Sequence, residues 1–442
     1  MRHIAFFCLL FVGISAQSQK EWTLRQCIDH AVENNISIKQ QALNVENAEI
    51  DLSTSKNSRL PSLGAGLSQS FSFGRSSMGN NVIESVNSSN TSFSISSSMP
   101  LFTGFRIPNE TRKNELNLQA AIETLKKAKD DIALQVASAY LETLFKKELL
   151  KVYQEQAELS RIQVERTKTL VEAGKAPESQ LFDIEAQLAK DELNITNAAN
   201  DLSMSLLNLS QALNIRDAAS FDVAEPVLGD VIEKNLSSIL PVEQIYQASI
   251  AIKPQVKEQE YLLESSKKNL KIAESGHWPT LDLSMGYSTS FQHVFNIGNN
   301  QPFSTQIRDR GSEYIGLSLN IPIFNRFETR NRVRAARLNI QNYELSLDNA
   351  KLTLYKEIQQ AYQSAVSAQA RYNSTEKACA SAAEAFKYAE ERYNVGKSTV
   401  FEYTEARTKL LSSKSEQVQA KYDFLFRAKI LDFYRGIEIN IE

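Results

Sequence analysis

Few residues of this sequence have the types and spacing that chemistry requires. Its four histidines do not fall into a metal-ligand spacing: His3, His30, His277 and His293. The five methionines do not cluster, and no glycine-rich phosphate loop of the Walker type is present. No acid, base and nucleophile form a recognisable set. We therefore expect no enzyme activity, no metal site and no cofactor, so that any energy must come from a partner.

The cysteines and the overall charge argue against two further classes of protein, those that depend on disulfides and those that bind nucleic acid. Cys27 and Cys379 could pair in an oxidising compartment, but a chain of 442 residues does not depend on one disulfide. We expect two free or buried thiols. The formal net charge of −3 and the isoelectric point near 6.0 give no basic footprint for nucleic acid. Nucleic acid is therefore not an expected partner.

The first residues have the pattern of a secretory signal peptide. A basic start precedes an apolar run over 4–14, and Ser15-Ala16 follows as a cleavage site. The run is too short to cross a membrane as a helix, and no later stretch of about 18 apolar residues occurs. The sequence predicts a signal peptide at 1–16 and an exported mature chain without a membrane-spanning helix.

The mature chain consists of two copies of one unit. Pro61 in LPSL and Pro279 in WPTL lie 218 residues apart. Later pairs are 222 residues apart: Pro100 and Pro322, Tyr140 and Tyr362, Gly174 and Gly396, Ile215 and Ile437. The separation between matching residues changes from 218 to 222 within a Ser/Asn/Gly-rich loop, the kind of segment that tolerates insertion. We assign the first repeat to 17–215, an inter-repeat segment to 216–239 and the second repeat to 240–442.

Each repeat contains two stretches with strict alternation. Aliphatic or aromatic residues alternate with small or polar ones at 62–74, 91–102, 280–291 and 313–323. These lengths suit tilted membrane strands. A soluble β-sandwich would usually carry Lys, Glu and Thr on its polar face, whereas this face is small and nearly uncharged. The pattern predicts strands with one face toward lipid and the other toward a lumen.

Four strands cannot close a membrane barrel by themselves. An open sheet edge would leave N–H and C=O groups unpaired in lipid, so several chains must contribute. Two chains would give eight strands, and a barrel of that size is filled by side chains. The residues alone do not choose the number of chains, but a duct favours three or more.

A long helix follows the strands of each repeat, at 104–172 and 326–394. No proline occurs from 109 to 176 or from 323 to 442, and both spans are rich in strong helix formers. At 1.5 Å per residue each helix spans roughly 100 Å. Such a helix needs a buried stripe, for which we expect Ile132, Val136, Ala139, Tyr140, Thr143 and Leu144.

Both long helices end at a glycine. Gly174 and Gly396 stand where a left-handed cap is expected. Pro177 then fits the first turn of a returning helix, and Ser398 fits the N-cap at the corresponding turn. Each repeat is therefore predicted to form a helical hairpin.

Several motifs stand at the junctions of these elements: WTLRQCIDHAVENN at the start, LPSL and WPTL before strands, PLFTGF and PIFNRF after strands, and ERYNVGKSTVFEYTEAR at a tip. In these motifs the sequence resembles the TolC-type outer-membrane efflux proteins over nearly the whole mature chain. The resemblance implies a mainly helical fold with a membrane β-barrel. In a homotrimer, twelve strands would form the barrel in outer-membrane lipid, and twelve helices would form a periplasmic α-barrel.

The resemblance also implies pore residues at the hairpin tips. Tyr393, three residues before Gly396, matches a tyrosine that constricts the tunnel entrance, and Glu402 and Glu405 match two pore aspartates. Ser398 stands where the family has an arginine, so that contact is absent or rebuilt. The same spacings in the first repeat give Gln180 and Asp183. A plainer interpretation of the acidic residues is that they stabilise a helix start through its dipole.

The resemblance further implies partners. A periplasmic adaptor protein would meet the two turns at Gly174, Lys175, Gly396, Lys397 and Ser398. The adaptor would connect the channel to an inner-membrane efflux pump or ABC transporter. The protein would then be the passive exit duct of a tripartite efflux or secretion system, located in the outer membrane and extending into the periplasm.

Two alternatives come from other functional classes. A structural or adhesive outer-membrane protein with a helical stalk would not require the tip motif or the duplication. An envelope enzyme would require a catalytic cluster, and the sequence offers none. The duct is therefore the favoured hypothesis.

Overall fold

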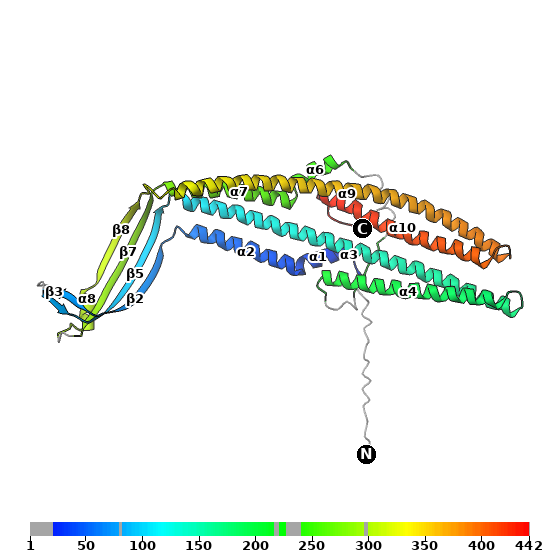
Figure 1. The fold of residues 1–442 in the computed structure, drawn as a ribbon, viewed down its shortest axis with the longest axis horizontal. Helices are drawn as coiled ribbons and strands as arrows, with labels where there is room; N and C mark the ends of the chain where they lie inside the picture. Colours follow the sequence, from blue (N-terminus) through cyan, green and yellow to red (C-terminus); the bar gives the residue numbers. More distant parts are fainter. Residues whose placement is uncertain (1–20, 79–81, 216–220, 227–239, 296–298, 442) are drawn as a thin grey trace, which may run out of the picture. The chain divides into compact units, whose positions relative to one another are not determined.

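The computed structural model describes residues 21–78, 82–215, 221–226, 240–295 and 299–441. The predicted signal peptide and most of the inter-repeat segment lie outside these residues. The chain forms two compact units, each drawn from both repeats (Figure 1). The strand unit comprises Gln41–Leu125 and Pro254–Lys351, and the hairpin unit comprises Met1–Gln40, Lys126–Lys253 and Leu352–Glu442. Within the described residues, no helix is long and apolar enough to cross a membrane.

The strand unit contains a four-stranded antiparallel sheet in the order β2-β5-β7-β8 (Figure 1). Its strands are β2 (Ser62–Ser72), β5 (Ser88–Phe102), β7 (Thr280–Val294) and β8 (Ser312–Asn320). Each repeat supplies one hairpin, and the long pairing of β5 with β7 joins the two repeats. β2 and β8 are the edges of this sheet. Smaller elements here are β3 (Arg75–Met78), β4 (Val82–Ser85) and α8 (Phe303–Asp309).

The predicted alternation appears as an exposed apolar face. The large side chains exposed on the two edge strands include Leu63, Leu67, Phe71, Ile315, Leu317 and Leu319. β8 ends at Asn320, although the alternation continues to 323. The pairing with β7 ends at Thr280 and Asn320, and the prolines just beyond, Pro279 and Pro322, have no N–H to extend it.

The long helices begin two residues after the predicted positions. α3 spans Arg106–Glu172 and α9 spans Glu328–Asn394, each with 67 residues. The preceding residues are left-handed, with φ of +59° and +67° at Gly104 and Phe105, and +56° and +63° at Arg326 and Phe327. A right-handed helix cannot include them, so it starts afterwards. Gly104 also has no room for a side chain, since a Cβ there would lie 2.6 Å from Cβ of Trp278.

Polar contacts hold the helices of the strand unit together. This unit includes most of α2 (Ile36–Asn57), with α7 (Pro254–Glu274) and the short 3-10 helix η1 (Ser275–His277). The Thr111 hydroxyl of α3 donates to the Ser55 carbonyl of α2 over 3.4 Å. The Ser265 hydroxyl of α7 donates to Oδ1 of Asn117 in α3 over 2.6 Å. α3 is therefore bound to helices of both repeats.

The hairpin unit contains two helical hairpins, α3 with α4 (Glu178–Ala212) and α9 with α10 (Val400–Tyr434) (Figure 1). Shorter elements surround them: β1 (Glu21–Trp22), α1 (Leu24–Asn34), β6 (Asp222–Val223) and α6 (Val242–Ile250). The parallel pair β1–β6 packs against α3, where the Tyr140 hydroxyl lies 2.7 Å from the Ala224 carbonyl oxygen and 3.1 Å from that of Trp22. The start of the first repeat and the segment that follows the repeat are thereby joined to its long helix.

The core of the hairpin unit confirms the predicted stripe of α3. Val136, Tyr140, Thr143 and Leu144 are buried, and Ile132 and Ala139 are partly buried against them. Cys27 lies in the same core, where burial raises the pKa of its thiol to about 12. Cys379 is also buried, and both cysteines are free. The thiols therefore act as small apolar groups.

Lys253 is a buried cation in the hairpin unit. Its side chain is 5 % exposed, and Nζ lies 3.8 Å from the Asp130 carboxylate. Nζ also lies 3.3 Å from the ring centroid of Phe433. Burial lowers the pKa of Lys253 from 10.5 to about 8, although Asp130 acts in the opposite direction. Folding therefore opposes the charged form of this lysine.

This burial predicts a stability that increases with pH. Between about pH 8 and pH 10 the unfolded chain binds more protons at this lysine than the folded chain, so the free energy of unfolding should rise by roughly 2 kcal/mol. Lys253→Met should remove the rise. Thermal unfolding of the full chain in detergent, measured from pH 7 to pH 10, checks this result. The exposed Lys56→Met is the control and should keep the rise; an undiminished rise in Lys253→Met would contradict the prediction.

Candidate functional site

The two hairpin tips have the same backbone conformation. Gly174 and Gly396 are left-handed, with φ of +68° and +72°. The Lys175 N–H donates to the Leu170 carbonyl and the Lys397 N–H to the Arg392 carbonyl, both over 2.8 Å. These bonds, with a second bond from each glycine N–H, form a Schellman turn. The predicted glycine caps are thus present in both repeats, and each turns the chain sharply.

The returning helices begin differently from the predictions. Thr399, not Ser398, is the N-cap of α10: its hydroxyl accepts from the Glu402 N–H, while the Glu402 carboxylate accepts from the Thr399 N–H over 3.3 Å. The Ser398 hydroxyl donates to the same carboxylate. Pro177 is itself the N-cap of α4 and not a first-turn residue, because its ψ of 150° is extended. Only the second tip therefore has a side-chain cap.

Glu402 therefore has a local structural role. Bonds from Ser398 and from the Thr399 backbone, and Arg392 at 3.7 Å, lower the pKa of its carboxyl. The predicted pore residues Glu405 and Asp183 are exposed. Glu405 follows Glu402 by three residues on α10, so the two carboxylates lie on neighbouring positions of one helix face.

An aromatic cluster packs the second tip. The rings of Tyr393 and Tyr403 stack with centroids 4.9 Å apart, and the Phe386 centroid lies 5.6 Å from that of Tyr403. Ala382 and Leu410 complete the buried cluster. Burial raises the pKa of the Tyr403 hydroxyl. The cluster fixes α10 against α9 and sets the position of the Tyr393 hydroxyl.

Two pairs of residues join the hairpin tips of the two repeats by hydrogen bonds. Gln180 Nε2 donates to the Tyr393 hydroxyl over 2.7 Å, so the structure brings together two predicted pore residues that lie 213 positions apart. Arg166 of α3 donates to the side-chain oxygen of Asn394 at the end of α9 and, over 3.4 Å, to its carbonyl oxygen. Both contacts lie near the turns. Separating the tips would therefore break hydrogen bonds that water can replace.

Sequence reasoning missed a buried ion pair behind the tips. The Arg407 guanidinium of α10 contacts the Asp191 carboxylate of α4, with side chains 3 % and 2 % exposed. Arg407 also donates to the Ser160 hydroxyl and, over 3.2 Å, to the Gln156 carbonyl of α3. Gln187 Nε2 donates to Asp191 over 3.0 Å. This network joins α10 of the second repeat to α3 and α4 of the first.

A sequence signal for this pair existed. Arg407 follows Tyr403 by four residues and precedes Leu410 by three, so it occupies the apolar stripe of α10. Asp191 lies seven residues after Ile184 and seven before Ala198, in the corresponding stripe of α4. A cation and an anion at apolar positions of two helices indicate a buried pair. Among the described residues, no group of three or more His, Cys, Asp or Glu is arranged to hold a metal ion.

Comparisons with known proteins agree with this architecture. The family described as outer membrane efflux protein matches residues 27–214 and 245–433, one segment in each repeat. The outer membrane protein TolC of Escherichia coli is 24 % identical over 434 residues, which cover 93 % of this chain and 82 % of that protein.

Solved structures show the same fold. The CmeC outer membrane channel of Campylobacter jejuni has a TM-score of 0.75 at 19 % identity, covering 94 % of this chain and 86 % of that one. The MtrE outer membrane channel of Neisseria gonorrhoeae in its open state has a TM-score of 0.72 at 18 % identity, covering 95 % and 90 %.

Proposed function

The chain belongs to the outer membrane efflux protein family, and we propose that three copies of it form a passive exit duct coupled to an inner-membrane transporter through a periplasmic adaptor protein. It is an outer-membrane channel protein, not an enzyme, and it extends into the periplasm. Three copies of the four-stranded sheet would supply a barrel of twelve strands. Two hairpins per chain would supply a twelve-helix tunnel.

The observation that supports a barrel closed by several chains is the sheet with two free edges, and the number three follows the family resemblance. β2 and β8 each pair with one described strand only, and both expose large apolar side chains. In lipid, their unpaired backbone groups must meet partners, and the matching edge of another copy provides them. A side-by-side ring also places the apolar face toward lipid. The strand lengths of 9–15 residues suit a tilted membrane barrel.

The hairpin tips supply the proposed entrance and docking site. Tyr393 and Gln180 would hold the entrance closed, while Glu402, Glu405 and Asp183 would lie along the passage. The turns with Gly174 and Gly396 carry exposed Lys175 and Lys397 beside them, and these turns would meet the adaptor, with Ser398 at the edge of the contact.

Single-channel recording tests the duct. The full-length protein, purified in detergent and inserted into a planar bilayer, should give discrete conductance steps, and its mass should correspond to three chains. The triple variant Tyr393→Ala, Glu402→Ala and Glu405→Ala should conduct more than the parent. Absence of conductance in both proteins would overturn the duct.

Polyvalent cations should block the open channel. Six carboxylates from Glu402 and Glu405 in a trimer would attract such ions, so Glu402→Ala with Glu405→Ala should weaken block by hexamminecobalt(III) by about tenfold, or ~1.4 kcal/mol. The double variant Glu376→Ala with Glu384→Ala removes the same charge from α9 and should retain the block. An unchanged block in the first variant would place its carboxylates outside the passage.

A further inference from the structure

The start of α9 carries an unusual excess of positive charge. Residues 326–337 contain five arginines and one glutamate. The matching stretch of the first repeat, 104–115, contains three basic and two acidic residues. There Arg106 contacts Glu110 over 3.0 Å and Arg112 contacts Glu115 over 2.6 Å. The duplication therefore provides an internal reference, and only the second copy is strongly basic.

Most of these arginines lack an acidic partner. Glu328, the single carboxylate of the stretch, forms an ion pair with Arg332. In the described part of the chain, Arg330, Arg334 and Arg337 form no ion pair, and all three are exposed. Arg330 lies in the first turn of α9, where the helix dipole disfavours a cation. The local fold therefore does not compensate this charge, and a bound anion would.

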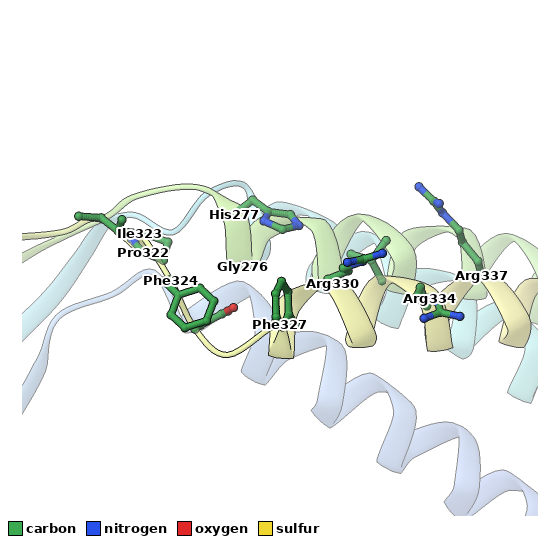
Figure 2. A pocket seen from close by; sticks show the side chains of 11 residues that line it. Gly276, His277, Pro322, Ile323, Phe324, Phe327, Arg330, Arg334 and Arg337 are labelled. Atoms are coloured by element: carbon green, nitrogen blue, oxygen red, sulfur yellow. The ribbon is translucent and has the colours of Figure 1, made fainter.

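The three arginines belong to one pocket. Their spacing of four and three residues places them on one face of α9, and Figure 2 shows their side chains along the helix beside the strand-to-helix junction. The pocket has a volume of about 650 Å³ and is also lined by His277, Phe324 and Phe327. The Arg330 guanidinium carbon lies 5.9 Å from the Phe327 ring centroid. Cationic and aromatic groups thus share one cavity.

An apolar rim joins this pocket to the end of β8. Ile323 and Phe324, which line the pocket, are 95 % and 71 % exposed. They follow β8 by a few residues, and β8 itself exposes Ile315, Leu317 and Leu319. Where the four-stranded sheet crosses the outer membrane, as proposed above, this junction would lie at the level of the inner-leaflet head groups. Aromatic residues at such a level, with arginines beyond them, match the polarity change across a lipid leaflet.

We propose that this pocket binds the phosphodiester head group of an inner-leaflet phospholipid, an inference that relies on the membrane placement of β8 in the proposed function. Arg330, Arg334 and Arg337 hold the phosphate, because guanidinium groups donate paired hydrogen bonds to phosphate oxygens. Ile323 and Phe324 contact the first methylenes of the acyl chains. Basic pockets of membrane proteins recognise lipid head groups by the same combination of charge and apolar contact.

Native mass spectrometry of the full-length protein in detergent tests this site. Dioleoyl phosphatidylglycerol should bind as a discrete mass increment, whereas dioleoylglycerol, which has the same chains and no phosphate, should not. Changing Arg330, Arg334 and Arg337 together to Gln should weaken phosphatidylglycerol binding at least tenfold. The matched first-repeat triple, Arg106→Gln, Arg112→Gln and Lys113→Gln, should weaken it less than twofold.

Further measurements separate the remaining outcomes. Changing the same three arginines to Lys keeps the charge but removes the paired hydrogen bonds, so lipid binding should fall between that of the parent and that of the Gln triple, whereas misfolding would abolish it in both triples. Inorganic phosphate at 10 mM should not displace the lipid; displacement would assign the pocket to a free anion and overturn the proposal, as would equal losses in the two glutamine triples. The Arg330, Arg334 and Arg337 glutamine triple should conduct normally in a bilayer, so loss of lipid binding and failure of the duct are distinguishable.

Discussion

The free energy of unfolding should fall by about 3–5 kcal/mol when Arg407 is replaced by methionine. Methionine keeps an unbranched apolar stem but removes the cation from a site where the side chains of Arg407 and Asp191 are 3 % and 2 % exposed. The Asp191 carboxylate would then keep only neutral partners, Ser160 and Gln187. These cannot compensate a desolvated charge. Denaturant unfolding of the full chain in detergent measures the loss.

A double variant separates two contributions to the free energy of unfolding: the penalty of leaving one buried charge unpaired, and the stabilisation that the ion pair itself provides. Arg407→Met with Asp191→Leu removes both charges and should recover most of the stability lost by Arg407→Met alone. Arg427→Met is the control, since its pair with Asp423 is partly exposed and should be worth at most about 1 kcal/mol. A double variant as unstable as the single one would show that the site needs the ion pair itself.

The helices and strands of this fold were predictable where the sequence shows a periodic pattern or an internal repeat. Alternation at 62–74 and 313–323 predicted two strands of the antiparallel sheet, and the constant separation of matching residues predicted two equivalent hairpins with Gly174 and Gly396 at their turns. These signals are local or repeated, so one sequence suffices to detect them. Element ends were less predictable: the helix starts depend on left-handed residues such as Phe105 and Phe327, which are not glycine and carry no clear local signal.

The contacts at the tips were less predictable than the turns. Tyr393 and Gln180 were both expected at the entrance, but their hydrogen bond depends on how two distant hairpins meet. Nothing in the sequence indicated the contact between Arg166 and Asn394, because exposed polar residues are common on helices. The buried pair of Arg407 and Asp191 does interrupt two apolar stripes, but each residue alone also fits an exposed helix face. Recognising the pair requires knowing that the stripes face each other.

The contact between the hairpins is unusually polar along α3. Gln156, Ser160, Gln163 and Thr167 are buried on one face of this helix. Gln163 Nε2 and Thr167 Oγ1 have no hydrogen-bond partner within the described residues. Buried polar atoms without partners oppose tight association, and they would gain water if the helices separated. Arg407 holds Gln156 and Ser160, so a movement would be easiest nearer the turns, around Gln163 and Thr167.

We expect the proposed entrance to open when the two polar contacts between its hairpin tips are removed together. Tyr393→Phe deletes the hydroxyl bonded to Gln180 but keeps the ring stacked on Tyr403, and Arg166→Gln removes the contact with Asn394. If each contact contributes about 0.5–1 kcal/mol, the six contacts of a trimer contribute ~3–6 kcal/mol to a concerted opening. The upper value would shift the ratio of closed to open channels about 10⁴-fold.

Planar-bilayer recording should therefore show at least a severalfold higher mean conductance for the double variant. Tyr388→Phe with Arg161→Gln is the matched control, because it makes the same two chemical changes five residues away from the bonded positions. The control should conduct like the parent. A similar rise in both variants would point to general loosening of the helices, and no rise in either would place the constriction elsewhere. A rise confined to Tyr393→Phe with Arg166→Gln assigns closure to bonds within each protomer, since both bonds join hairpins of one chain.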